Sequence, residues 1–378
     1  MSDETRPEPD RIEGAPHPRD TARLIGQDAA EAAFLNAYTT GRLHHGWLLT
    51  GPRGVGKATL AWRIARFLLA EPAEEQGGGL FGDAPPAPTS LDIAPENPIA
   101  RRIAAGSEGR LFVLRRAWDA DRKRLKTQIT VDEVRKLKSF FGLSAADGGR
   151  RVVIVDPADE MNPSAANALL KVLEEPPART TLLLVSHQPS GLLPTIRSRC
   201  RELRLGALGP AAMAEALAAA GTDPEGDPRA LAELSTGSVG EAIRLAHMEG
   251  LKAYAGLVAL FSGLPRLDRP RALALADSVA GRGAETRLDL TLDLIELFLA
   301  RLARAGAIGA VPPEAAPGEA ELLARLSPNP YAGRVWADLH QTLGARARHA
   351  RAVNLDPAAL VLDMVLKIDE TAAPIAAR

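Results

Sequence analysis

The chain of 378 residues contains a single cysteine, Cys200, and this scarcity excludes an intrachain disulfide and any zinc site built from several cysteines. A protein without disulfides suits a reducing compartment, so we expect it in the cytoplasm. An excess of one charge is also missing, because 46 Lys and Arg stand against 47 Asp and Glu. The whole molecule is therefore not a polyanion binder, and any contact with nucleic acid has to come from a local patch or from partner chains.

Long hydrophobic runs are absent as well. No apolar run approaches the ~20 residues that cross a bilayer, so we expect no membrane partner. The first 20 residues are rich in Pro, Asp and Glu and lack the apolar core of a signal peptide. This composition predicts a disordered tail over residues 1–20.

The most informative stretch is residues 51–59, which follow the apolar run 47–49 and lead into a helical pattern. In a strand, glycine loop and helix, the motif G-x-x-x-x-G-K holds phosphate, because backbone amides and the positive helix end face the anion. A turn that merely contains glycines is the alternative, and the flanking pattern argues against it. The motif normally ends in Lys-Ser or Lys-Thr, whose hydroxyl binds Mg²⁺, but Ala58 stands there. The predicted nucleotide-binding residues of the loop are Gly51, Pro52, Arg53, Gly54, Val55, Gly56, Lys57, Ala58 and Thr59.

Asp156 is the remaining predicted nucleotide-binding residue. It ends the apolar run 151–155, which is typical of a central strand buried on both faces of a parallel sheet. An acid at the carboxyl end of such a strand lies beside the phosphate loop, in the Walker B position. The alternative is an aspartate that only opens the turn before Pro157.

The order of elements predicts an α/β fold, a P-loop doubly wound parallel sheet, over residues 21–205. After Gly206 the strand-like runs stop, and alanine and leucine dominate. We therefore expect a small helical lid domain at residues 206–265 and an all-α block at residues 266–378. Within the α/β part, residues 71–98 are rich in Gly, Pro, Ala and Glu and are interpreted as a flexible excursion.

A basic segment lies at residues 115–126. A solvated loop is the plainer interpretation, and a patch that faces DNA or a neighbouring subunit is the alternative. Trp118 stands alone, so no aromatic stacking pattern decides between them. The cations of the segment are Arg115, Arg116, Arg122, Lys123, Arg124 and Lys126, diluted by Asp119 and Asp121.

Two motifs carry a specific family resemblance. Residues 167–177 read NALLKVLEEPP, and Ser198-Arg199-Cys200 follows them. Together they resemble the bacterial clamp-loader ATPases of the AAA+ class, the group formed by the gamma/tau and delta-prime subunits of DNA polymerase III. The resemblance is close over residues 21–205 and moderate over 206–250. It implies that the C-terminal block is the collar of a pentameric ring.

The departures from the motor subunits of that group are informative. In the motor, a glutamate follows the Walker B acid, whereas Pro157 follows Asp156 here. Gly240 stands where the motor subunits have a sensor arginine. Ala58 stands where they have the hydroxyl residue that binds Mg²⁺. The family's four-cysteine zinc module is missing, so we expect no zinc. The pattern resembles the delta-prime type, a subunit without catalysis of its own in which ATP binding is weak or absent.

The resemblance implies one catalytic residue, Arg199, as an arginine finger lent in trans to a neighbouring ATP site. A surface ion pair is the alternative. His187 falls at the family's first sensor. The implied partners are the gamma/tau and delta subunits, with the sliding clamp and primer–template DNA reached through the complex. The alternatives are a gamma/tau-type motor that hydrolyses ATP and, less favoured, a free-standing P-loop enzyme such as a nucleotide kinase.

Overall fold

The computed structural model describes residues 8, 11–12, 14–21, 23–70, 87–143, 149–222, 227–281, 283–353 and 355–376. The chain groups into two compact units. The first comprises Met1–Thr222 with Gly237–Glu241, and the second comprises Asp223–Thr236 with Ala242–Arg378. The predicted division into a tail and three domains, with boundaries after residues 20, 205 and 265, stays a prediction.

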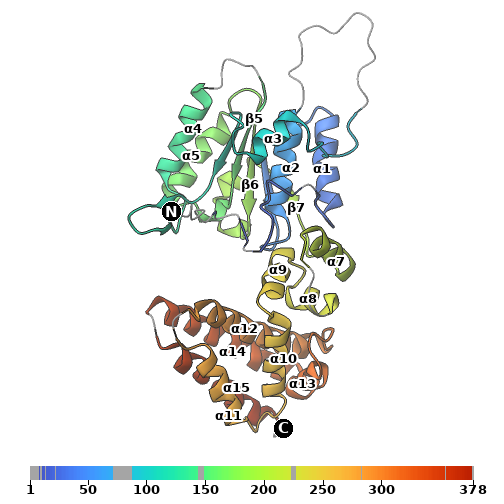
Figure 1. Ribbon diagram of the computed structural model, residues 1–378, viewed down its shortest axis with the longest axis vertical. Coiled ribbons are helices and arrows are strands. Elements are labelled where there is room, and N and C mark those ends of the chain that lie inside the picture. The colour runs from blue at the N-terminus through green and yellow to red at the C-terminus, as the bar shows by residue number, and fades with distance from the viewer. Residues whose placement is uncertain are drawn as a thin grey trace, which may run out of the picture. The chain divides into compact units, whose positions relative to one another are not determined.

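A five-stranded parallel sheet forms the centre of the first unit, as the sequence predicts (Figure 1). The strand order is β2-β5-β6-β1-β7. Helices α1, α2 and α3 cover one face of the sheet, and α4 and α5 cover the other. The strands are β1 (Gly46–Thr50), β2 (Leu111–Leu114), β5 (Arg151–Val155), β6 (Thr180–Ser186) and β7 (Arg201–Arg204).

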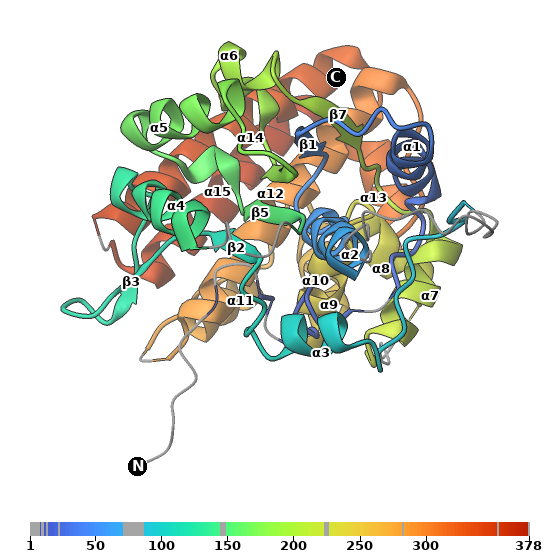
Figure 2. The same ribbon diagram turned by 90° about the horizontal axis from the view of Figure 1, so that it is seen from above.

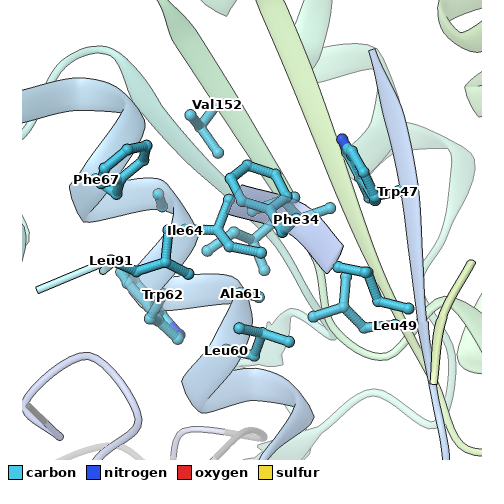
Figure 3. Close-up of a cluster of buried hydrophobic side chains, with 14 of the residues drawn as sticks. Phe34, Trp47, Leu49, Leu60, Ala61, Trp62, Ile64, Phe67, Leu91 and Val152 are labelled. Atoms are coloured by element: carbon cyan, nitrogen blue, oxygen red, sulfur yellow. The ribbon is translucent and has the colours of Figure 1, made fainter. Parts of the chain in front are cut away.

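Alternation along the strands divides the core into two layers, because successive side chains point to opposite faces. In β1, Trp47 and Leu49 pack with α1 and α2, whereas Leu48 packs on the other face with α5. Figure 3 shows the first layer, in which Phe34 lies against Trp47 with ring centroids 5.0 Å apart. Burial on both faces explains why these strands are continuous apolar runs in the sequence.

Glycines and capping residues fix where helices of the first unit begin. Gly26 has φ of +72°, in the left-handed region, and α1 starts two residues later, at Asp28. The Asn162 side chain accepts the Ala165 N–H and caps α5. The helices are α1 (Asp28–Thr39), α2 (Lys57–Ala70), α3 (Pro98–Ala104), α4 (Val131–Leu143), α5 (Pro163–Glu174), α6 (Pro194–Arg197) and α7 (Pro210–Ala219), with 3₁₀ turns at Ala158–Glu160 and Pro189–Gly191.

A hairpin not foreseen from the sequence lies inside the basic segment. It pairs β3 (Trp118–Asp119) with β4 (Arg124–Leu125) in antiparallel register. Two-residue strands are too short for the alternation on which sequence-based assignment depends.

The second unit is helical, as predicted after Gly206 (Figure 1). Its centre is a buried polar network. Glu319 is fully buried, accepts hydrogen bonds from Tyr254 Oη at 2.6 Å and Arg301 Nε at 2.6 Å, and takes the Ala315 N–H at 2.7 Å. The helices are α8 (Pro228–Leu234), α10 (Gly250–Phe261), α11 (Arg269–Ser278), α12 (Glu285–Ile308), α13 (Glu319–Leu326), α14 (Pro330–Ala352) and α15 (Pro357–Ala376), and α9 (Val239–His247) spans the boundary between the units.

Two segments predicted to be flexible contain described residues that are buried, while residues 1–7, 9–10 and 13 of the predicted tail lie outside the described residues. In the predicted tail, His17 is only 3% exposed and lies edge-on to Trp62 of α2. In the predicted excursion, residues 71–86 lie outside the described residues, but Leu91 is buried and Asp92 pairs with Arg63 at 2.9 Å. Composition averages over a whole segment, so it does not reveal a single buried residue within a polar stretch. None of the described helices is long and apolar enough to cross a membrane.

Candidate functional site

The predicted phosphate loop joins the carboxyl end of β1 to the first residue of α2. Three of its glycines have positive φ: Gly51 at 139°, Gly54 at 77° and Gly56 at 103°. A Cβ at Gly51 would meet the Leu205 carbonyl oxygen at 2.3 Å, so no side chain fits there. These backbone conformations turn the loop sharply into the helix N-terminus, the arrangement that presents amide groups to an anion.

Lys57 is held at the base of this loop. Its side chain is buried, and Nζ donates hydrogen bonds to the carbonyl oxygens of Gly51, at 2.7 Å, and Pro52. A lysine ammonium carries three donors, so one donor remains for a phosphate oxygen. Burial lowers the Lys57 pKa to about 8, against the opposing charges of Asp156 and Asp159. The cation is therefore present at neutral pH, and a bound anion would favour it further.

The structure brings Asp156 to the same edge of the sheet. Just past the end of β5, the Asp156 backbone N–H donates a hydrogen bond to the Leu114 carbonyl oxygen, and Asp156 is only 5% exposed. The carboxylate acts electrostatically on Lys57, which joins the two predicted site residues. Ala58 and Thr59, in the first turn of α2, are half-buried. The loop and Lys57 fit a phosphate chain, whereas Ala58 offers no oxygen to a magnesium ion.

The acids that follow Asp156 are engaged elsewhere. Asp159 accepts hydrogen bonds from Ser186 Oγ at 2.5 Å and from the backbone N–H groups of His187 and Gln188 at 2.5 and 3.1 Å. Glu160 pairs with Arg116 at 2.6 Å, and burial raises the Glu160 pKa against that pairing. Both carboxylates are thus engaged by protein groups.

His187 lies in the same electrostatic environment at the end of β6. Burial, together with the charges of Lys57 and Arg53, lowers its pKa to about 4 although Asp159 opposes the shift. The imidazole is therefore neutral at physiological pH. A neutral ring at this position offers a hydrogen bond to a ligand without adding positive charge.

The N-terminus of α9 packs directly on the phosphate loop. The Gly240 N–H bonds the Gly54 carbonyl at 3.0 Å, and a Cβ on Gly54 would meet Ser238 Oγ at 2.2 Å. A Cβ on Gly240 would meet Ile12 at 2.3 Å and Gly54 Cα at 3.2 Å. A side chain at residue 240 would require the end of the Ile12 side chain to move and would lie tightly against the Gly54 backbone.

Gln27 is a site residue that sequence reasoning missed. It is 5% exposed, and its amide nitrogen donates to the carbonyl oxygens of Val55 at 3.1 Å and Gly206 at 2.8 Å. Its amide oxygen accepts the Gly206 N–H at 3.1 Å. Gln27 thus ties the phosphate loop to the segment after β7. A glutamine at a helix start gives no sequence signal for this contact, which joins segments about 180 residues apart.

Arg199 lies at the other edge of the sheet. It precedes β7, whose Arg201 is in register with Trp47 near the start of β1. A Cβ added to Gly46, the first residue of β1, would meet the Arg199 carbonyl oxygen at 3.0 Å, so these two backbones adjoin. The phosphate loop begins after Thr50 at the opposite end of β1, and five strand residues span about 16 Å. Arg199 is therefore remote from this chain's own phosphate loop.

The Arg199 side chain is partly exposed and oriented by two contacts. Its Nη1 donates to the Thr195 carbonyl at 3.0 Å, and its Nη2 pairs with Glu174 of α5 at 3.0 Å. The surface ion pair considered from the sequence is thus present, between side chains that are 37% and 44% exposed. Such a pair is weak and can exchange for a stronger anion. Glu174 belongs to the NALLKVLEEPP motif, so the two sequence motifs meet in space.

The parallel sheet, the glycine loop on its carboxyl edge and the helices that follow define a P-loop α/β protein. Residues 26–209, which lie in the first unit, match the family described as "DNA polymerase III, delta subunit". The loop, Asp156 and Arg199 all lie inside the matched segment.

Individual proteins with names of the same kind are similar to this chain. DNA polymerase III subunit delta' of Pseudomonas aeruginosa is 40% identical over 209 residues, which are 55% of this chain and 57% of that protein. DNA polymerase III subunit gamma/tau of Mycobacterium tuberculosis is 31% identical over 206 residues, 53% of this chain and 31% of that protein. The chain thus spans only part of the length of these relatives. A DNA polymerase III gamma subunit-related protein from Thermotoga maritima superimposes with a TM-score of 0.39 at 17% identity, covering 90% of this chain and 99% of that one.

Proposed function

We propose that this chain is the delta-prime-type subunit of a bacterial clamp loader, a cytoplasmic assembly with gamma/tau and delta subunits that loads the sliding clamp onto primed DNA. In this role it completes a neighbour's ATP site with Arg199 and hydrolyses little ATP itself. The family match and the relatives named delta' and gamma/tau support the assignment.

The position of Arg199 carries the proposal. A residue at the amino edge of the sheet is too far from its own phosphate loop to act in cis, so a role in phosphoryl transfer requires a second subunit. A guanidinium suits this role because it is planar, permanently charged and bidentate toward phosphate oxygens. Glu174 would hold it in place until the neighbour's nucleotide replaces the carboxylate.

The test is ATP hydrolysis and clamp loading by a complex reconstituted with Arg199→Ala in this subunit alone. Because fingers supplied in trans accelerate related reactions by roughly 10³–10⁵, we expect a clear loss at the one site served, seen as a partial loss in the complex. Arg199→Lys should rescue poorly, since a point charge does not bridge two oxygens.

Arg197, an exposed residue of α6 two positions earlier, provides the matched control. Arg197→Ala removes the same charge two positions away and should leave the rates at the wild-type level. Wild-type rates for Arg199→Ala in verified complete complexes would refute the finger.

We further propose that this subunit binds ATP weakly and with little dependence on Mg²⁺, and that it needs no zinc. Lys57 and the loop amides remain for phosphate, but Ala58 has no oxygen for the metal, and Asp159 and Glu160 are engaged by other groups. Titration of the isolated chain with fluorescent ATP, with and without Mg²⁺, tests this. Tight binding that collapses on adding a chelator, with turnover abolished by Lys57→Ala, would instead support a gamma/tau-type motor.

A further inference from the structure

The hairpin of β3 and β4 is an exposed basic element that plays no part in the proposed role of Arg199. Its loop, its second strand and the residue after that strand carry four cations, which are exposed or half-buried. Among the described residues, no ion pair engages them. In Figure 2 the hairpin, labelled β3, projects away from the rest of the first unit near α4. The four cations are Arg122, Lys123, Arg124 and Lys126.

The tip of the hairpin has a defined backbone shape. Asp119 Oδ1 accepts the N–H groups of Asp121 at 3.2 Å and Arg122 at 3.1 Å, which closes the turn. Lys123 has φ of 48°, and the Lys126 N–H bonds the Ala117 carbonyl at 2.9 Å across the base. The Asp119 carboxylate therefore accepts hydrogen bonds within the turn and forms no ion pair with the described cations of the hairpin.

The base of the hairpin is anchored to the body of the unit. Arg115 pairs with Glu8 at 3.0 Å, and Arg116 pairs with Glu160 at 2.6 Å. The six cations of the basic segment thus divide into two that hold the hairpin and four that form no ion pair with a described residue. The acids in the first turn of α4 do not compete for these four, because Asp132 pairs with Arg135 and Glu133 with Lys136.

We propose that this hairpin is a nucleic-acid-binding element that contacts the phosphate backbone of DNA. A two-stranded ribbon fits the major groove, and exposed Lys and Arg on it neutralise phosphates. An acidic protein partner is less favoured, because Trp118 and Leu125, the apolar residues of the strands, are both half-buried. The exposed tip therefore lacks the apolar and aromatic anchors that dominate protein interfaces.

The experiment is fluorescence anisotropy of a labelled 30-bp duplex with the full chain, over a range of low salt concentrations. The hairpin variant combines Arg122→Gln, Lys123→Asn and Arg124→Gln. We expect at least tenfold weaker binding than wild type at the lowest salt. The slope of log affinity against log salt should fall by about 2.7, since each lost phosphate contact removes about 0.9.

The matched control combines Arg42→Gln, Arg101→Gln and Lys138→Gln, three exposed residues of the same unit outside the hairpin. It changes the net charge equally and should keep most of the affinity. Should the triple hairpin variant fail to fold, Arg122→Gln alone should still lower the slope by about 0.9.

Three outcomes would overturn the proposal: equal losses in the two triple variants, no loss in the hairpin variant, or no binding by wild type at the lowest salt. Tighter binding of poly-glutamate than of the duplex would also overturn it and assign the hairpin to an acidic protein. Since no partner subunit is present, these results are independent of the Arg199 assay.

Discussion

At the scale of single residues, Lys57 and His187 show how one electrostatic environment prepares a phosphate site. Both side chains are withdrawn from water, and burial lowers both pKa values, to about 8 and about 4. At pH 7 the lysine is charged and the histidine is neutral. Lys57 therefore supplies a cation at the base of the loop, and it contributes to the low pKa of His187.

A pH dependence of stability follows from His187. In the unfolded chain its pKa returns to the ordinary 6.5, so between pH 6.5 and 4 the unfolded state binds more protons. The contribution of His187 to stability is therefore complete above pH 6.5 and is lost as the pH falls toward 4. Relative to His187→Gln, the wild type should lose about 1–2 kcal/mol of unfolding free energy between pH 7 and 4.5, measured by urea denaturation.

The Lys57→Met background provides the control for this measurement. Removing the neighbouring cation should raise the His187 pKa and reduce the pH-dependent difference. A difference between wild type and His187→Gln that stays constant from pH 7 to 4.5 would contradict the assignment.

At the scale of elements, helices α12 and α14 cross at a backbone contact made possible by two glycines. A Cβ on Gly333 would meet the Ala307 nitrogen at 2.7 Å and the Ala303 carbonyl oxygen at 2.9 Å. A Cβ on Gly306 would meet the Gly333 Cα at 2.7 Å. The atoms met are backbone atoms, which cannot turn aside as a flexible side chain would.

Gly333→Ala should therefore destabilise the second unit, although alanine is the better helix former. Overpacking of this kind costs about 1–3 kcal/mol, measurable as a lower urea midpoint. Gly256→Ala is the matched control, because Gly256 is exposed in α10 and a Cβ there meets nothing within 4 Å. That change should stabilise by up to about 1 kcal/mol, and equal effects of the two substitutions would argue against the close crossing.

At the scale of the whole molecule, the second unit depends on contacts between segments far apart in the chain. Phe261 of α10 stacks on Phe298 of α12 with centroids 4.9 Å apart, and Tyr254 of α10 bonds Glu319 of α13. The predicted domain boundary after residue 265 falls between these partners.

A fragment of residues 1–265 should accordingly lose the order of α10 while the P-loop unit stays folded. Removing residues 266–378 exposes Tyr254, Leu257 and Phe261, which are at most 2% exposed in the full chain. Limited proteolysis followed by mass spectrometry should locate early cuts within Gly250–Phe261 in the fragment and not in the full chain. Equal protection of α10 in both would show that the helix does not need the rest of the unit.

The sequence by itself determined the parallel α/β unit, the phosphate loop and the two family motifs, because these depend on local order. Buried strands read as apolar runs, glycines mark the sharp loop, and Ser198-Arg199-Cys200 is a contiguous signature. Only the tertiary structure brought Glu174 to Arg199, Gln27 to Val55 and Gly240 to Gly54. Each of these contacts joins segments distant in the chain, and their residue types alone do not predict them. The same holds for His17, which is buried because Trp62 lies beside it rather than because its neighbours in sequence are apolar.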